Sequence, residues 1–165
     1  MALVVETGSG LSTAEAYASQ AEADAYFAKL GQTAAWNAVA DKEVALRKGA
    51  NYIERKYQAR FRGVRQTTTQ RLSFPRASCF DDNGFYITGV PECVKEANIE
   101  LALISNTDTL LPAYSGGTIS KESVKVGEIA TSTDYVDGKD PVKHYPAIDG
   151  MLYRVLLSNG RVIRS

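Results

Sequence analysis

The chain has 165 residues, of which 44% are hydrophobic and 23% charged, and its basic and acidic residues are equal in number. This composition is that of one ordinary globular domain with an extension. No run approaches the roughly 20 apolar residues of a membrane span, so we expect a soluble protein that does not enter a membrane. The first residues lack the basic and apolar regions of a secretory signal, so we expect synthesis in a cytoplasm.

The first predicted elements are an N-terminal arm and an amphipathic helix. Residues 3–6 form a short β-prone run that a glycine-rich turn ends. Ser19 and Glu22 have the spacing of a capping box, in which the serine side chain and the glutamate side chain each bind a backbone amide of the helix start. A helix over residues 20–30 follows, with an apolar stripe of Ala23, Tyr26, Phe27 and Leu30.

A second helix is predicted from Asp41, a suitable N-cap, to about residue 58. Two small residues, Gly49 and Ala50, lie in the middle of its apolar face, where they would let another helix approach closely. The complete face is Leu46, Gly49, Ala50, Ile53 and Tyr57.

The second half of the chain predicts one more core helix, then a change of structure. Pro91 suits the first position of a third helix, which has apolar residues on two sides and should lie at the centre of its bundle. Residues 119–126 and 128–136 read as two strands around a tight turn, and Pro146 opens a short helix. We therefore predict a mainly α fold, a small bundle of about three core helices plus a short C-terminal helix, with a β-hairpin and extended arms. Residues 1–112 form the helical bundle domain, and residues 113–165 form the hairpin and a C-terminal docking arm.

The positive charge of this neutral chain is concentrated in residues 55–76, which hold seven of the nineteen basic residues and no acidic one. Arg55 and Lys56 would close the second helix, where cations complement the helix dipole. Within the loop that follows, residues 67–74 read as one short strand, anchored by the apolar side chains of Leu72 and Phe74.

The five loop arginines have two interpretations. They belong either to a solvated loop that pairs with carboxylates of the same or a neighbouring chain, or to a surface for a polyanion or an acidic partner. We expect the loop to divide between these roles. Arg60, Arg62 and Arg65 are predicted to face DNA or a partner, and Arg71 and Arg76 to make structural ion pairs or a subunit interface.

The sequence lacks the residue patterns of known catalytic chemistry. His144 is the only histidine, so no Ser-His-Asp or Cys-His system can be built around a second one. The carboxylates are not clustered at metal-binding spacing, Cys79 and Cys93 are fourteen residues apart and outside any Cys-x-x-Cys motif, and no phosphate-binding fingerprint is present. We expect no catalytic activity, no cofactor, no metal and two reduced cysteines.

The C-terminal segment from residue 145 to residue 165 follows a polar linker. Its short predicted helix has Ile148, Leu152 and Leu156 on one side, and the chain ends in a basic, β-branched run that contains Arg161 and Arg164. We expect these five residues to dock on another subunit or on a partner protein.

Several runs, taken in order and spacing, resemble one family of tailed-phage structural proteins over nearly the whole chain. They are Ala16-Tyr-Ala-Ser-Gln-Ala-Glu-Ala-Asp-Ala-Tyr-Phe27, Trp36, Gln70-x-Leu-x-Phe-Pro-Arg76, Val90-Pro-x-x-Val-Lys-x-Ala97 and Tyr145-Pro-Ala-Ile-Asp149. The chain is similar to head-to-tail adaptor, or connector, proteins, some of which carry the label of a primosome-type single-stranded-DNA-binding protein.

This resemblance implies a virion structural protein at the head-tail interface. It would form a ring, usually of twelve copies, beneath the portal protein, extend the channel for double-stranded DNA without reading its sequence, and join a downstream tail or stopper protein. The alternative is a single-stranded-DNA-binding module that acts in phage replication. Single-strand binding needs exposed aromatic rings among the basic residues. Tyr57, Phe61 and Phe74 lie in the basic segment. Their spacing assigns Tyr57 and Phe74 to the core, so only Phe61 is left for stacking on a base.

Overall fold

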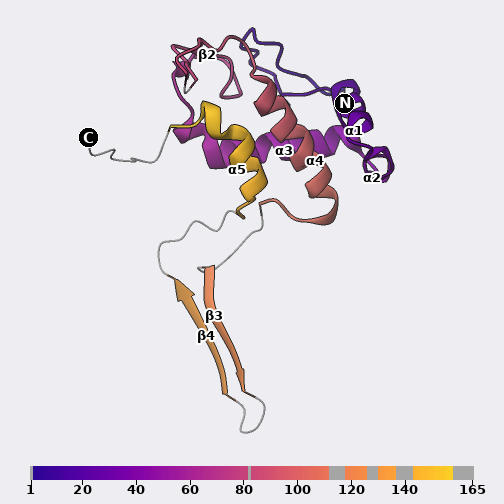
Figure 1. Cartoon of the computed structure of the whole chain (residues 1–165), viewed down its shortest axis with the longest axis vertical. Helices are drawn as coiled ribbons and strands as arrows, with labels where there is room; N and C mark the ends of the chain where they lie inside the picture. The colour runs from indigo at the N-terminus through magenta and orange to yellow at the C-terminus, as the bar shows by residue number, and fades with distance from the viewer. Residues whose placement is uncertain (1, 82, 112–117, 126–129, 137–142, 158–165) are drawn as a thin grey trace, which may run out of the picture. The chain divides into compact units, whose positions relative to one another are not determined.

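The computed structural model describes residues 2–81, 83–111, 118–125, 130–136 and 143–157 of the chain. Its helices, shown in Figure 1, are more extensive than its strands, so the predicted mainly α class is confirmed. The chain divides into two compact units, of which the first comprises residues 1–110 and 145–165 and the second residues 111–144. Among the described helices, none has the length and apolar character that a membrane crossing requires.

Helix α1 (Gln20–Lys29) begins with the predicted capping box. The Glu22 backbone amide donates to the Ser19 hydroxyl, and the Ser19 amide donates to the Glu22 carboxylate at 2.7 Å. Ala23 and Phe27 are fully buried, whereas the Leu30 side chain at the end of the predicted apolar stripe is 50% exposed. The stripe therefore packs on the core at its start and faces solvent at its end.

The short helix α2 (Thr33–Asn37) was not predicted, because its five residues carry no periodic signal of their own. Tertiary contacts hold it in place. The Trp36 ring lies 5.0 Å from the Phe27 ring, and its indole N–H donates to the Asp24 carboxylate at 2.6 Å. Residues of α1 thus fix a segment that the sequence alone indicates as a loop.

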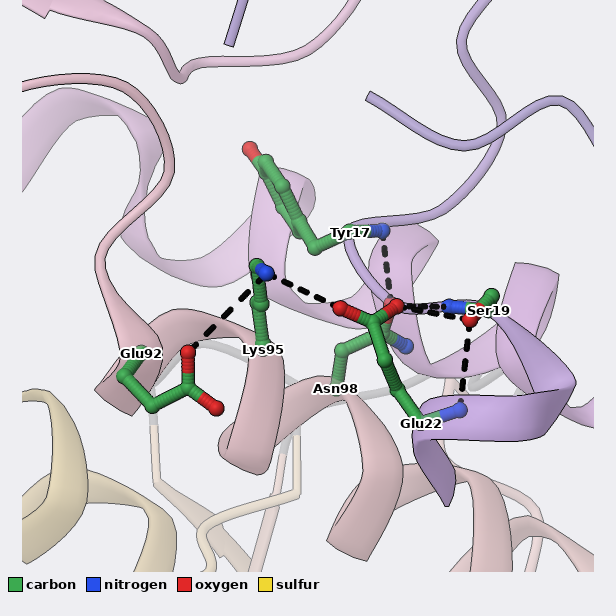
Figure 2. Close-up of polar contacts among 6 residues, drawn as sticks. All are labelled: Tyr17, Ser19, Glu22, Glu92, Lys95 and Asn98. Atoms are coloured by element: carbon green, nitrogen blue, oxygen red, sulfur yellow. Dashed lines mark hydrogen bonds and ion pairs between the residues drawn. The ribbon is translucent and has the colours of Figure 1, made fainter. Parts of the chain in front are cut away.

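Helices α3 (Lys42–Tyr57) and α4 (Glu92–Thr107) form the centre of the helical unit, and α4 also contacts α1 and the C-terminal helix. The predicted close approach occurs at Gly49, which faces Asn98 of α4. The buried Asn98 side chain donates to the Leu46 carbonyl at 2.8 Å and accepts from the Tyr17 amide at 2.8 Å. Figure 2 shows this second bond, which joins α4 to the segment that precedes α1.

Helix α5 (Pro146–Leu152) and the 3-10 turn η2 (Tyr153–Val155) pack on the same unit, with α5 against α4. Ile148, Leu152 and Leu156 are at most 5% exposed, and the Tyr57 hydroxyl donates to Asp149 at 2.5 Å. The predicted docking role of these three apolar residues is therefore wrong, because they complete the core of their own chain. The predicted boundary after residue 112 changes accordingly, since residues 145–157 belong with the helices. Arg161 and Arg164 lie outside the described residues.

The second unit contains the predicted hairpin. Strand β3 (Thr118–Lys125) pairs antiparallel with β4 (Ala130–Val136), with Thr118 opposite Val136 and Lys125 opposite Ala130. The register shifts between Ile119 and Lys121, where one residue is left out of the pairing.

The predicted strand over residues 67–74 is wrong. Two short strands flank this segment instead, β1 (Val64–Arg65) and β2 (Arg76–Ala77), and they pair antiparallel. The apolar alternation is misleading because Ser73, between two buried apolar residues, is itself buried and donates to Glu54. Gln70 also lies inside this loop, where its amide donates to the carbonyls of Leu72 and Pro75.

We predict that Gly49→Ala destabilises the protein by about 1–3 kcal/mol, because the added methyl group would overpack the α3–α4 contact. A Cβ atom at Gly49 would lie 2.6 Å from the backbone oxygen of Asn98 and 2.7 Å from its side-chain nitrogen. Urea unfolding followed by circular dichroism measures the change. Gly150→Ala in α5 is the matched control, because nothing lies within 4 Å of its Cβ position, and it should be neutral or stabilising by up to about 1 kcal/mol. Equal stability of the two variants would contradict the close contact.

Candidate functional site

Arg76 organises the basic loop from within. Its guanidinium is partly buried, and this burial lowers the pKa of the group. The guanidinium donates to backbone carbonyl oxygens on both sides of the β1–β2 pair: Arg62 at 2.7 Å, Gly63 at 2.7 Å, Phe61 at 3.3 Å and Ser73 at 3.4 Å. Its Cζ atom also lies 5.9 Å from the centre of the Phe61 ring. One side chain therefore fixes the path of the backbone through residues 61–63.

Arg62 joins this loop to the C-terminal segment and to the turn that follows β2. Its Nε donates to the Leu156 carbonyl at 2.9 Å, and its Nη1 lies 3.5 Å from the Phe80 carbonyl. Backbone hydrogen bonds also join the loop to the C-terminal segment. The Arg62 amide donates to the Val155 carbonyl at 3.0 Å, and the Leu157 amide donates to the Arg60 carbonyl at 2.7 Å. Arg62 thus links the loop to two other segments, the residues around Leu156 and the turn at Phe80, through backbone carbonyl oxygens.

Residues 78–81 and 83–87 form a tight turn, which we call the aromatic turn. Phe80 and Tyr86 face each other in an isolated antiparallel bridge, with ring centres 5.3 Å apart. The Asp81 carboxylate accepts hydrogen bonds from the Asn83 and Phe85 amides, both at 2.9 Å. Backbone bonds close the turn at its base, where the Ile87 amide donates to the Cys79 carbonyl at 2.8 Å. The conformation of the turn is therefore fixed by its own hydrogen bonds.

Large apolar side chains on this turn and on β1 face solvent instead of the core. Phe85 is 70% exposed, Tyr86 54%, Phe80 47% and Val64 63%. Such a group of exposed apolar residues indicates an interaction site when basic residues lie beside it. We call this group the basic-aromatic surface, and its members are Arg62, Val64, Arg65, Phe80, Phe85 and Tyr86.

The structure divides the loop arginines into exposed and partly buried residues, and this division differs from the one predicted from the sequence. Arg65 is exposed as predicted, but Arg60 and Arg62 are partly buried, and Arg60 Nε is buried without a hydrogen-bond partner among the described residues. The predicted ion pair of Arg76 is not found among the described residues, where its guanidinium donates to backbone carbonyls instead. Arg71 is 57% exposed and lies 4.0 Å from the Glu15 carboxylate, a distant pair that stabilises little.

The aromatic residues also differ from the prediction. Tyr57 and Phe74 are buried as expected, but Phe61, expected to be available for stacking, is only 2% exposed and packs on Phe74 at 4.9 Å. The sequence reasoning missed Phe80, Phe85 and Tyr86. The signal was present, because aromatic residues on both sides of an Asp-Asp-Asn-Gly turn are brought together when that turn closes.

This arrangement suits a planar, negatively charged ligand. Exposed aromatic rings stack on planar groups, and arginines bind phosphate through a fixed fork of N–H donors. Asp81 adds a negative charge within the turn, and its Oδ1 accepts hydrogen bonds from two backbone amides. Cys79 is buried beneath the turn, and burial raises the pKa of its thiol. In the described part of the chain no three His, Cys, Asp or Glu residues gather as metal ligands would.

Comparison with known proteins identifies the family. Over residues 1–165 the chain matches the family described as "Putative DnaT-like ssDNA binding protein", and it belongs to that family. No curated protein and no solved structure matches the chain. This description agrees with the single-stranded-DNA-binding label that some members of the resembling family carry. The adaptor assignment itself, with its portal, ring and tail partners and its place in the virion, stays a prediction.

We predict that Arg76→Lys destabilises the protein by about 1–3 kcal/mol, because a single ammonium group cannot reach the carbonyls that the guanidinium binds. Thermal unfolding or urea unfolding measures the loss. Arg65→Lys is the control, since this exposed side chain should tolerate the change within about 0.5 kcal/mol. If both variants unfold like the wild type, Arg76 does not organise the loop.

Proposed function

We propose that the protein binds single-stranded DNA on the basic-aromatic surface. The observation that supports this most is the aromatic turn, which holds three rings 47–70% exposed on a backbone closed by its own hydrogen bonds. Rings that are already in place lose little entropy when a ligand stacks on them. The membership of the chain in its family supports the same conclusion.

The chemistry of the ligand follows from the two kinds of side chain. A base of a single strand is free to stack on Phe85 or Tyr86, and such stacking contributes about 1–3 kcal/mol per base. In a duplex the base faces are covered by neighbouring bases, so these rings would have no access to them. The surface should therefore prefer single strands, with little selectivity among base sequences.

The arginines supply the electrostatic part of the affinity. Arg65 is exposed on β1 and suits a phosphate contact, while Arg62 is bound to the backbone of the turn and so keeps its charge close to the rings. Each phosphate contact with a single strand should contribute about 0.7 to the slope of log affinity against log salt. The proposed binding is thus salt-dependent as well as dependent on the rings.

The test is the double variant Phe85→Ala/Tyr86→Ala, whose affinity for a fluorescent oligo(dT) should fall at least about tenfold in an anisotropy titration. Arg65→Ala should lower the affinity less and reduce the salt slope by about 0.7. The double variant and Arg65→Ala remove only exposed side chains, so circular dichroism should show an unchanged fold for each.

Two exposed positions on α3 provide matched controls. Val44→Ala removes an exposed apolar side chain, and Arg55→Ala removes an exposed arginine, both outside the proposed surface. Both should leave the affinity within about twofold of the wild type. Unchanged oligo(dT) binding by the double variant, or an equal preference for duplex DNA, would refute the proposal.

The β3–β4 hairpin favours a second candidate function, the head-to-tail adaptor. A two-stranded hairpin is marginally stable alone in water, and this one forms a unit of its own. A partner protein such as a portal could supply the surface that stabilises it. Co-sedimentation with portal protein tests this candidate, and a variant in which a short glycine-serine link replaces residues 118–136 should lose the complex while keeping its oligo(dT) affinity.

A further inference from the structure

A groove lies between α1 and α4, on elements that the basic-aromatic surface does not use. The cavity has a volume of ≈ 340 Å³. Its apolar lining consists of Ala25, Tyr26, Leu30 and Ile99, of which Leu30 is half-exposed. An apolar groove of this kind accommodates an aromatic or aliphatic side chain from a partner.

The rim of the groove carries more carboxylates than lysines. Glu92 and Glu96 stand one helical turn apart on α4, Glu22 lies opposite on α1, and Glu100 continues the α4 row and accepts a hydrogen bond from the Tyr26 hydroxyl at 2.9 Å. Figure 2 shows how Lys95 is engaged: its Nζ lies 2.9 Å from Glu22 and 3.9 Å from Glu92. Lys29 is the other lysine on the rim. The Glu92 side chain remains 77% exposed, so the rim presents unused negative charge.

We propose that this groove binds the basic-aromatic surface of a second copy of the chain. The match is both apolar and electrostatic. Phe85, which is 70% exposed at the tip of the aromatic turn, would enter the groove beside Leu30, and Arg65 of the same copy would face Glu92 and Glu96. An exposed ring and an exposed arginine on neighbouring segments thus meet a groove with an acidic rim, and the same chain supplies both.

The contact is heterologous, because each copy contributes a groove to one neighbour and an aromatic turn to another. If the proposed function holds, this contact and the binding of single-stranded DNA exclude each other. Phe85 and Arg65 cannot contact a second copy and a single strand at the same time. Single-stranded DNA should therefore dissociate the assembly.

The experiment is sedimentation velocity of the full chain at low ionic strength. The wild type should associate in a concentration-dependent way. Glu96→Lys reverses one charge on the groove rim, and Phe85→Asp replaces the inserted ring by a carboxylate. Each variant alone should associate at least about tenfold more weakly than the wild type. Mixed together, the two should form a 1:1 dimer that grows no further, because one intact groove and one intact turn remain between them.

A charge-matched control and a competition complete the test. Glu43→Lys changes the net charge by the same amount on α3 and should associate like the wild type, whereas excess oligo(dT) should dissociate the wild type. A monomeric wild type, normal association of Glu96→Lys, or a mixture that stays monomeric would each overturn the proposal. The oligo(dT) affinity of monomeric Glu96→Lys, measured separately, tests the proposed function whatever the outcome for self-association.

Discussion

The buried side chain of Asn98 is the interaction on which the rest of the helical unit depends. It binds the Leu46 carbonyl of α3 and the Tyr17 amide ahead of α1, so one amide group joins three segments that are far apart in the sequence. A buried amide without such partners would cost about 1–3 kcal/mol for each unsatisfied group. The absence of a side chain at Gly49 makes the arrangement possible, because any Cβ atom there would collide with Asn98.

The contact with Asn98 fixes the position of helix α3, and α3 in turn binds the loop of residues 60–76. Its Glu54 accepts hydrogen bonds from the Ser73 hydroxyl at 2.7 Å, from the Ser73 amide at 3.0 Å and from the Tyr17 hydroxyl. Ser73 is thereby fixed close to Arg76, whose guanidinium holds residues 61–63. Arg62 then contacts the turn that carries Phe80, Phe85 and Tyr86. A continuous set of hydrogen bonds thus leads from the helix core to the exposed rings, which explains how a loop can present aromatic side chains to solvent in a fixed geometry.

Local signals in the sequence were sufficient for helices α1, α3, α4 and α5, but not for the short helix α2 or for the site. The Ser19–Glu22 capping box and the small residues facing α4 are properties of neighbouring positions, so both could be predicted. Arg76 could be identified as structural, but its carbonyl partners could not, because they come together only when β1 pairs with β2. Phe61 was misassigned for the same reason, since its burial depends on Phe74 and on the segment around Leu156. The exposed rings of the aromatic turn follow no periodic pattern, so the sequence does not indicate them as one surface.

We propose the aromatic turn and β1 as the contact surface for single-stranded DNA. A titration of the ¹⁵N-labelled protein with oligo(dT), followed by two-dimensional NMR, tests it most directly because every backbone amide reports separately. We expect the largest shift changes on residues 62–65, 78–81 and 83–87, while the amides of α3 from residue 42 to residue 53 change little. Changes concentrated on α3 or on the α1–α4 groove, with the aromatic turn unaffected, would contradict it.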